Sequence, residues 1–116
     1  MCSYLADCGF DLSVRIIEIA RYLEREGKAF ARMERMMTCG SDAGMLIRQA
    51  EKLPPGKARK EGYARALDNV AECTYLLDLL SATEDLSDRQ LRPIRAQCGA
   101  LEEELQSAVE KAKGKV

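Results

Sequence analysis

Apolar residues recur at intervals of three or four along four long segments of this 116-residue chain. This spacing places them on one face of an α-helix, and no stretch shows the strict alternation that a half-buried strand requires. The expected helices span Phe10–Glu26, Ala29–Leu53, Lys57–Ala82 and Asp88–Lys113. Long helices joined by short connections favour antiparallel neighbours. The sequence therefore predicts an all-α fold, an antiparallel up-down-up-down four-helix bundle.

Residues that end or begin helices separate these segments. Gly27 is a typical C-terminal stop, and the turn Pro54–Gly56 ends the second helix because proline lacks the amide donor. Ser87 and Gln90 have the spacing of a capping box, in which each side chain bonds the backbone of the other residue. These signals predict short connections between the four helices.

The composition predicts one aliphatic core. The chain has four Tyr, two Phe and no Trp, so Leu, Ile, Val, Met and Ala must fill the interior. A chain of this length buries enough surface for one self-sufficient domain. We expect this four-helix domain to cover residues 10–113. Residues 1–9 form an N-terminal extension or part of the first helix, and residues 114–116 form a frayed tail.

Several classes of functional site find no support in the sequence. There is no His, and no two of the five Cys residues have C-x-x-C spacing, which argues against a zinc site. We expect Cys39, Cys73 and Cys98 to be reduced core thiols, and we leave the state of Cys2 and Cys8 open. The usual catalytic sets are missing, so we expect no enzymatic activity, no catalytic residue and no cofactor.

The sequence also bears on location and charge. The first residues lack the features of a secretory signal, and no apolar run approaches the roughly 20 residues of a membrane span. The cytoplasm is therefore the expected compartment, with no membrane partner. A formal net charge of −1 argues against a dedicated nucleic-acid binder without excluding a local basic face.

The first three segments carry more apolar surface than one bundle stripe needs. Phe10, Val14 and Ile17 form a second stripe on the first helix, and Met45 projects opposite the expected core face of the second. A recurring surplus of this kind marks a partner interface, whereas scattered exposed hydrophobes are ordinary. We therefore predict self-association. The candidate interface residues are Phe10, Val14, Ile17, Met45, Leu46, Leu76 and Leu79.

Two glycines lie inside the second expected helix, where each costs roughly 1 kcal/mol relative to alanine. The stretch reads TCGSDAG over residues 38–44. Helical spacing puts Cys39, Gly40 and Ala43 on or near the core face, with Gly44 on its flank. Small residues there let a neighbouring helix approach closely, so we predict a helix-packing seam rather than an active site.

An alternative function rests on basic residues at the start of the third helix. Lys57, Arg59, Lys60 and Arg65 lie within three turns and are candidates for binding RNA or DNA. A solvated helix face explains the same residues, and no aromatic platform accompanies them. Paired catalysis by Asp42 and Glu51 is disfavoured, because about two and a half helical turns separate the two carboxylates.

Four blocks of the sequence resemble, in order, a family of small bacterial four-helix-bundle proteins, the 23S rRNA intervening-sequence proteins. The blocks are LSVRIIEIARYL (12–23), MMTCGSDAGMLIRQAE (36–51), ALDNVAECTYLLDLL (66–80) and TEDLSDRQLRPIRAQCGAL (83–101). The second block matches the family pattern at Gly40, Ser41, Gly44, Ile47, Arg48, Ala50 and Glu51, and departs from it at Thr38, Asp42, Ala43 and Leu46.

The resemblance implies an antiparallel four-helix bundle that assembles into a homopentameric barrel. It also implies a relationship to the accessory protein of diversity-generating retroelements, which binds a reverse transcriptase and nucleic acid. No catalytic residue carries over from the family. The main prediction is therefore a non-enzymatic, self-assembling scaffold or adaptor, and the alternative is an RNA- or DNA-binding accessory subunit.

Overall fold

The computed structural model describes residues 4–28, 30–83 and 85–113, and it is all-α over these ranges. Its helices are α1 (Tyr4–Arg25), α2 (Met33–Glu51), α3 (Lys57–Ala82) and α4 (Asp88–Lys113). The bounds of α3 and α4 are those predicted. The first helix begins at Tyr4, so residues 4–9 belong to it, and the predicted frayed tail over 114–116 lies outside the described residues.

The second helix is shorter than predicted at both ends. It begins at Met33 rather than Ala29, after a connection that follows Gly27. It ends at Glu51 rather than Leu53, and the next turn tightens: the Lys52 and Leu53 amides donate to carbonyls three residues back, at 3.2 and 3.1 Å. A residue that precedes proline disfavours the α conformation, which explains why Leu53 lies outside the helix.

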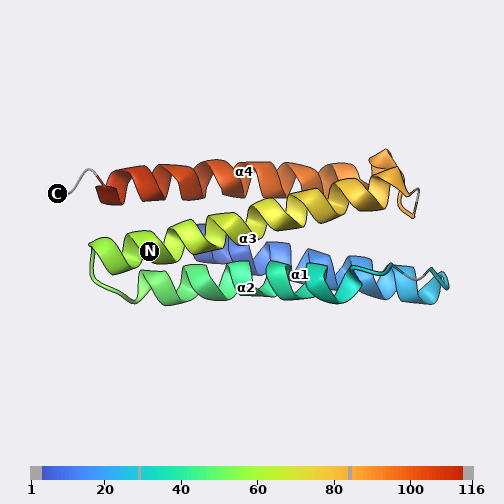
Figure 1. Cartoon of the computed structure of the whole chain (residues 1–116), viewed down its shortest axis with the longest axis horizontal. Helices are drawn as coiled ribbons and strands as arrows, with labels where there is room; N and C mark the ends of the chain where they lie inside the picture. Colours follow the sequence, from blue (N-terminus) through green and yellow to red (C-terminus); the bar gives the residue numbers. More distant parts are fainter. Residues whose placement is uncertain (1–3, 29, 84, 114–116) are drawn as a thin grey trace.

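The four helices pack side by side into an elongated body with principal extents of 50 × 24 × 19 Å. Figure 1 shows that α1 and α3 begin at one end of this body, and that α2 and α4 begin at the other. The pairs α1–α2, α2–α3 and α3–α4 make extensive contacts, and α1 touches α4 over a smaller area. The described helices thus form a bundle in which α2 and α3 each have two close neighbours.

The core between the helices is aliphatic, as predicted from the scarcity of aromatic residues. Over the described residues no polar or charged side chain is buried, and Tyr63 is the single aromatic residue in the core. The largest fully buried side chains of the core are Leu12, Ile16, Leu23, Met36, Ile47, Leu76, Leu77, Leu80, Leu91, Ile94, Leu101 and Leu105. Each of the four helices contributes to this list, so one continuous core stabilises the bundle.

The predicted helix-end signals act as expected. Gly27 has a φ of 69°, and the Lys28 amide donates to the Leu23 carbonyl at 2.9 Å, which is the bonding of a glycine C-terminal cap. At the start of α4, the Gln90 amide donates to Ser87 Oγ at 3.1 Å. The Ser87 amide donates to Gln90 Oε1 at 2.9 Å, which completes the capping box.

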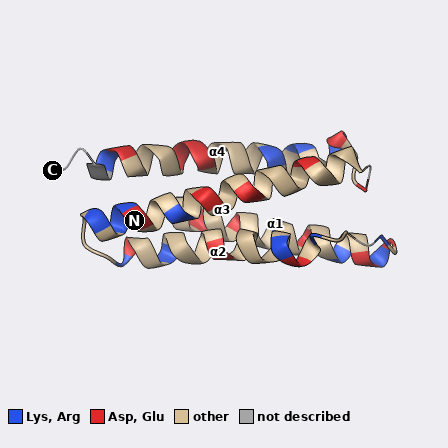
Figure 2. Cartoon of the chain, in the orientation of Figure 1, with Lys and Arg blue, Asp and Glu red and all other residues tan. Residues whose placement is uncertain are grey.

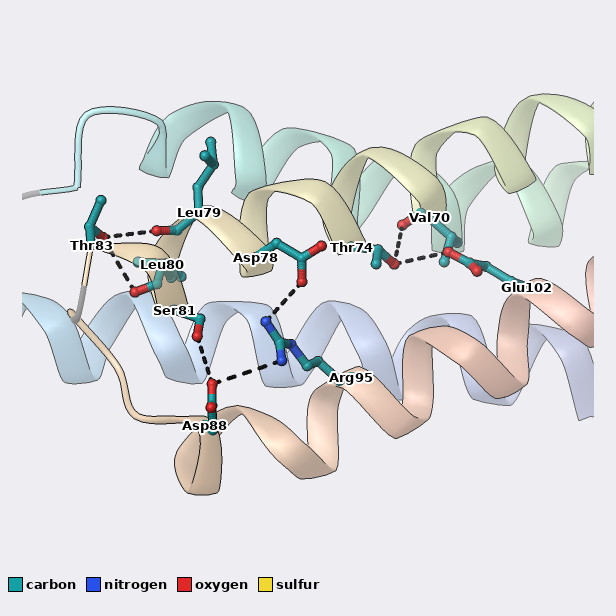
Figure 3. A network of polar contacts seen from close by, with 10 residues as sticks. All are labelled: Val70, Thr74, Asp78, Leu79, Leu80, Ser81, Thr83, Asp88, Arg95 and Glu102. Carbon is teal, nitrogen blue, oxygen red and sulfur yellow. Dashed lines mark hydrogen bonds and ion pairs between the residues drawn. The ribbon is translucent and has the colours of Figure 1, made fainter.

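Polar side chains line the outer contact between α3 and α4 (Figure 3). Arg95 of α4 donates to Asp78 of α3 at 2.8 Å and lies 4.0 Å from Asp88, which accepts from Ser81 at 2.6 Å. Farther along, Thr74 donates to Glu102 at 2.9 Å. Exposed pairs of this kind add little stability, but they make this face of the bundle polar.

Candidate self-association site

The first and second helices approach each other closely at three glycines. A Cβ on Gly40 would lie 2.9 Å from Ile16 Cγ1, and a Cβ on Gly44 would lie 3.0 Å from the Gly9 carbonyl oxygen. Gly9 in turn lies against Gly44. The Ser13 hydroxyl, 3.0 Å from the carbonyl oxygens of both Gly9 and Gly40, bonds across this contact. The α1–α2 contact therefore has no room for larger side chains at these positions.

The four residues of the predicted seam divide between two neighbours of α2. Gly40 and Gly44 face α1, as the contacts above show. Cys39 is fully buried on the other side, where its sulfur lies 3.1 Å from that of Cys73 in α3. Ala43 is buried in the core with no exposed surface. The second helix thus uses small residues to pack against α1 and α3 at once.

The predicted second stripe of α1 is exposed on the bundle surface. Phe10 is 55% exposed, Val14 39% and Ile17 40%. Their spacing of four and three residues places all three side chains along one side of the helix. The guanidinium of Arg48, from α2, lies 5.8 Å from the centre of the Phe10 ring, which places this end of the stripe beside α2.

Two methionines extend the apolar surface onto α2. Met45 is 52% exposed and lies one turn before Arg48, and Met37 is 39% exposed. Met37 and Ile17 line the same open groove of about 620 Å³, together with the apolar residues Ala20, Leu23, Phe30 and Met33 and the charged residues Arg21, Glu24 and Lys28. We call the set Phe10, Val14, Ile17, Met37 and Met45 the α1–α2 apolar face. Met37 was not among the interface residues predicted from the sequence, although its spacing of eight residues from Met45 places both on one side of the helix.

One predicted interface residue lies in the core instead. Leu76 is 1% exposed, so its prediction as an interface residue is wrong. The physical reason is that α3 also packs along a second side. Glu72, one turn before Leu76, bonds Arg35 of α2 through both carboxylate oxygens, which places this side of α3 against α2. Leu46 and Leu79 are only partly buried and pack against the core. The large apolar side chain of α3 that does face solvent is Tyr75, at 63% exposure.

The structure places the four basic residues of the alternative hypothesis in different surroundings. Arg59 donates to the Ala50 and Glu51 carbonyls at 3.2 and 3.1 Å, and thereby caps the C-terminal end of α2. Lys60 is half-buried, whereas Lys57 and Arg65 are exposed. Figure 2 shows the positive charge at the start of α3, followed by mixed charge along the helix. Burial raises the pKa of the Glu51 carboxyl, and the nearby Arg59 charge opposes that rise.

The described residues offer neither a metal site nor a membrane-spanning helix. No group of three or more His, Cys, Asp or Glu side chains in that part of the chain has an arrangement that would hold a metal ion. Within the same ranges, no helix combines the length and the apolar character needed to cross a bilayer.

Comparison with known proteins finds a similarity among solved structures. No model of a protein family matches the chain, and no curated protein matches it. Among solved structures, it is similar to a protein of unknown function from the S23 ribosomal protein family of Bacteroides thetaiotaomicron. The identity is 26%, the TM-score is 0.83, and the match covers 90% of this chain and 97% of that protein.

This similarity supports an S23-family-like four-helix fold and leaves the function open, because the neighbour itself has unknown function. It agrees with the coarser part of the resemblance seen in the sequence. The narrower link to 23S rRNA intervening-sequence proteins and to retroelement accessory proteins stays a prediction.

Proposed function

We propose that this protein is a non-enzymatic scaffold or adaptor subunit that assembles with copies of itself through the α1–α2 apolar face. In this proposal the protomer is an antiparallel up-down-up-down bundle, the family resemblance favours a homopentameric ring, and the cytoplasm is the expected compartment. The single observation that carries the proposal is the gathering of exposed apolar side chains on one helix pair. Contiguous apolar surface of this kind marks an interaction site more often than isolated exposed residues do.

A ring requires each protomer to offer two different surfaces, because a head-to-tail contact joins unlike faces. The α1–α2 apolar face supplies the first surface in this proposal. The second is the exposed side of α3 around Tyr75, with the half-buried Leu79 beside it. An exposed tyrosine suits such a contact, since its ring buries apolar area while its hydroxyl stays hydrogen-bonded.

The proposal is tested by placing one charge on the face and an equal charge outside it. Val14→Lys puts an ammonium group into the proposed contact, whereas Leu53→Lys changes a side chain with the same 39% exposure in the turn after α2. Desolvating an unpaired charge at an interface is costly, so Val14→Lys should weaken assembly by about 30-fold or more. Sedimentation velocity over a concentration series measures the change.

The same two variants supply the control and the result that would contradict the proposal. Leu53→Lys should assemble as the wild type does, and circular dichroism should show wild-type helix content in both variants. Equal assembly of Val14→Lys and Leu53→Lys would mean that the α1–α2 apolar face is not the contact.

The alternative role in binding RNA or DNA, including a partnership with a reverse transcriptase, stays a prediction. Arg59, one of the four candidate residues, donates two hydrogen bonds to carbonyls at the end of α2, which occupies donors that a phosphate would need. The chain as a whole has a formal net charge of −1, which disfavours the attraction of a polyanion such as RNA or DNA. For this reason we favour self-assembly.

A further inference from the structure

Two buried thiols meet in the contact between α2 and α3. Cys39 and Cys73 are both fully buried, and their sulfur atoms lie 3.1 Å apart. Cys39 Sγ also lies 3.5 Å from the Met36 carbonyl oxygen. Both residues are free thiols in the structure. Two sulfurs in direct contact from different helices need little movement to become bonded, since a disulfide bond is about 2.05 Å long.

A third buried thiol is available nearby but is placed differently. Cys98 of α4 has no exposed surface. Burial raises the pKa of the Cys98 thiol to about 11, which keeps it protonated, and a hydrogen bond with Thr74 opposes that rise. The close sulfur contact joins Cys39 to Cys73, so Cys98 serves as an internal comparison.

The surroundings of the pair give its two thiols unequal acidity. Hydrogen bonding between the two thiols lowers the pKa of Cys39 and raises that of Cys73, whereas burial raises the pKa of both thiols. Arg35, one turn before Cys39, lowers the pKa of Cys39, whereas Glu72, which precedes Cys73, raises it. The ion pair between Arg35 and Glu72 spans α2 and α3 beside the thiols. The pKa of Cys39 is thus shifted downward and the pKa of Cys73 upward.

We propose that Cys39 and Cys73 are a site of reversible oxidation, at which hydrogen peroxide converts the two thiols into a disulfide that links α2 to α3. The Cys39 thiolate attacks one peroxide oxygen and becomes a sulfenic acid, and the departing hydroxide takes up the proton that Cys39 had lost. The Cys73 sulfur then attacks the Cys39 sulfur and displaces the hydroxyl group, which leaves as water with the Cys73 proton. In sum, two thiols and one peroxide yield one disulfide and two waters.

Burial decides the rate of this reaction. Neither sulfur is exposed, so peroxide reaches the pair during local opening of the α2–α3 contact rather than at the surface. The half-buried Cys8 has easier access and competes for the oxidant. For that reason, the experiment uses the full chain with Cys2→Ser and Cys8→Ser, which leaves only the three core thiols.

The test is treatment of this folded chain with hydrogen peroxide, followed by alkylation and peptide mapping by mass spectrometry. The expected product is a Cys39–Cys73 disulfide that dithiothreitol reverses, with wild-type helix content by circular dichroism. Adding Cys98→Ala should leave its yield unchanged, whereas adding Cys73→Ala should abolish it. The same oxidation in concentrated urea should instead favour Cys73–Cys98, because that loop is shorter than the loop between Cys39 and Cys73.

Three results would overturn the proposal. The first is a folded chain that yields no intramolecular disulfide. The second is a folded chain that pairs Cys98 with either other thiol in preference to Cys39–Cys73. The third is the same distribution of disulfides in the folded and urea-unfolded chains, because pairing would then follow chain entropy rather than the observed contact. None of these outcomes depends on self-assembly, so the two proposals are tested separately.

Discussion

Gly40→Leu is expected to lower the free energy of unfolding by about 1–2 kcal/mol, the cost of overpacking less the gain in helix preference. The first carbon of any side chain at this position would lie 2.9 Å from Ile16 Cγ1, and Ile16 itself is 1% exposed in the core. The added atoms must therefore displace Ile16 or separate α1 from α2, and overpacking of this kind typically costs about 1–3 kcal/mol. Leucine favours the helix over glycine by less than about 1 kcal/mol, which offsets only part of that cost. Urea unfolding followed by circular dichroism measures the loss.

Gly99→Leu is the matched control for this substitution. Gly99 also lies within a helix, but a Cβ there would meet nothing within 4 Å. We expect this variant to gain about 0.5–1 kcal/mol from the helix preference alone. If Gly40→Leu were as stable as Gly99→Leu, the close approach of α1 and α2 at Gly40 would be wrong.

Leu76→Ala is expected to lower the free energy of unfolding by about 2–5 kcal/mol, which is the usual cost of emptying a buried leucine site. Leu76 is 1% exposed, between α3 and its neighbours. Leu79→Ala is the comparison. Leu79 is only partly buried, so this substitution should lower the free energy of unfolding clearly less. Both substitutions are best measured in the Val14→Lys background, so that a change in assembly does not enter the unfolding free energy.

Comparing the unfolding free energies of these two variants tests which of the two leucines of α3 lies in the core. Equal losses for Leu76→Ala and Leu79→Ala would contradict the burial of Leu76. A small loss for Leu76→Ala, together with weakened assembly in the wild-type background, would restore Leu76 to the interface.

The helix ends could be predicted where the sequence contains local signals. Ser87 and Gln90 define the start of α4 through bonds between neighbouring residues, so the spacing alone was sufficient. The start of α1 had no such signal, and Gly9 in the stretch DCGF resembles a break. In the structure this glycine continues the helix because it packs against Gly44, a residue far away in the sequence. Tertiary packing thus outweighs local propensity at that position.

The candidate site shows the same division between local and distant causes. The exposure of Phe10, Val14 and Ile17 agrees with the second stripe seen in the sequence. The placement of Leu76 did not follow, because a single-stripe interpretation of α3 neglects its second neighbour. Arg59 illustrates a further limit: its charge suggested a ligand, but its partners are carbonyls at the end of α2. Those carbonyls lie within reach of Arg59 because the turn between α2 and α3 brings α3 back against α2.

The molar mass of the wild-type chain in solution tests the central claim most directly. The chain alone has a mass of 12.9 kDa. Size-exclusion chromatography with multi-angle light scattering, at micromolar protein concentration, should give a discrete multiple of that mass, with five copies favoured by the family resemblance. A single sharp peak at the mass of one chain would contradict assembly through the α1–α2 apolar face.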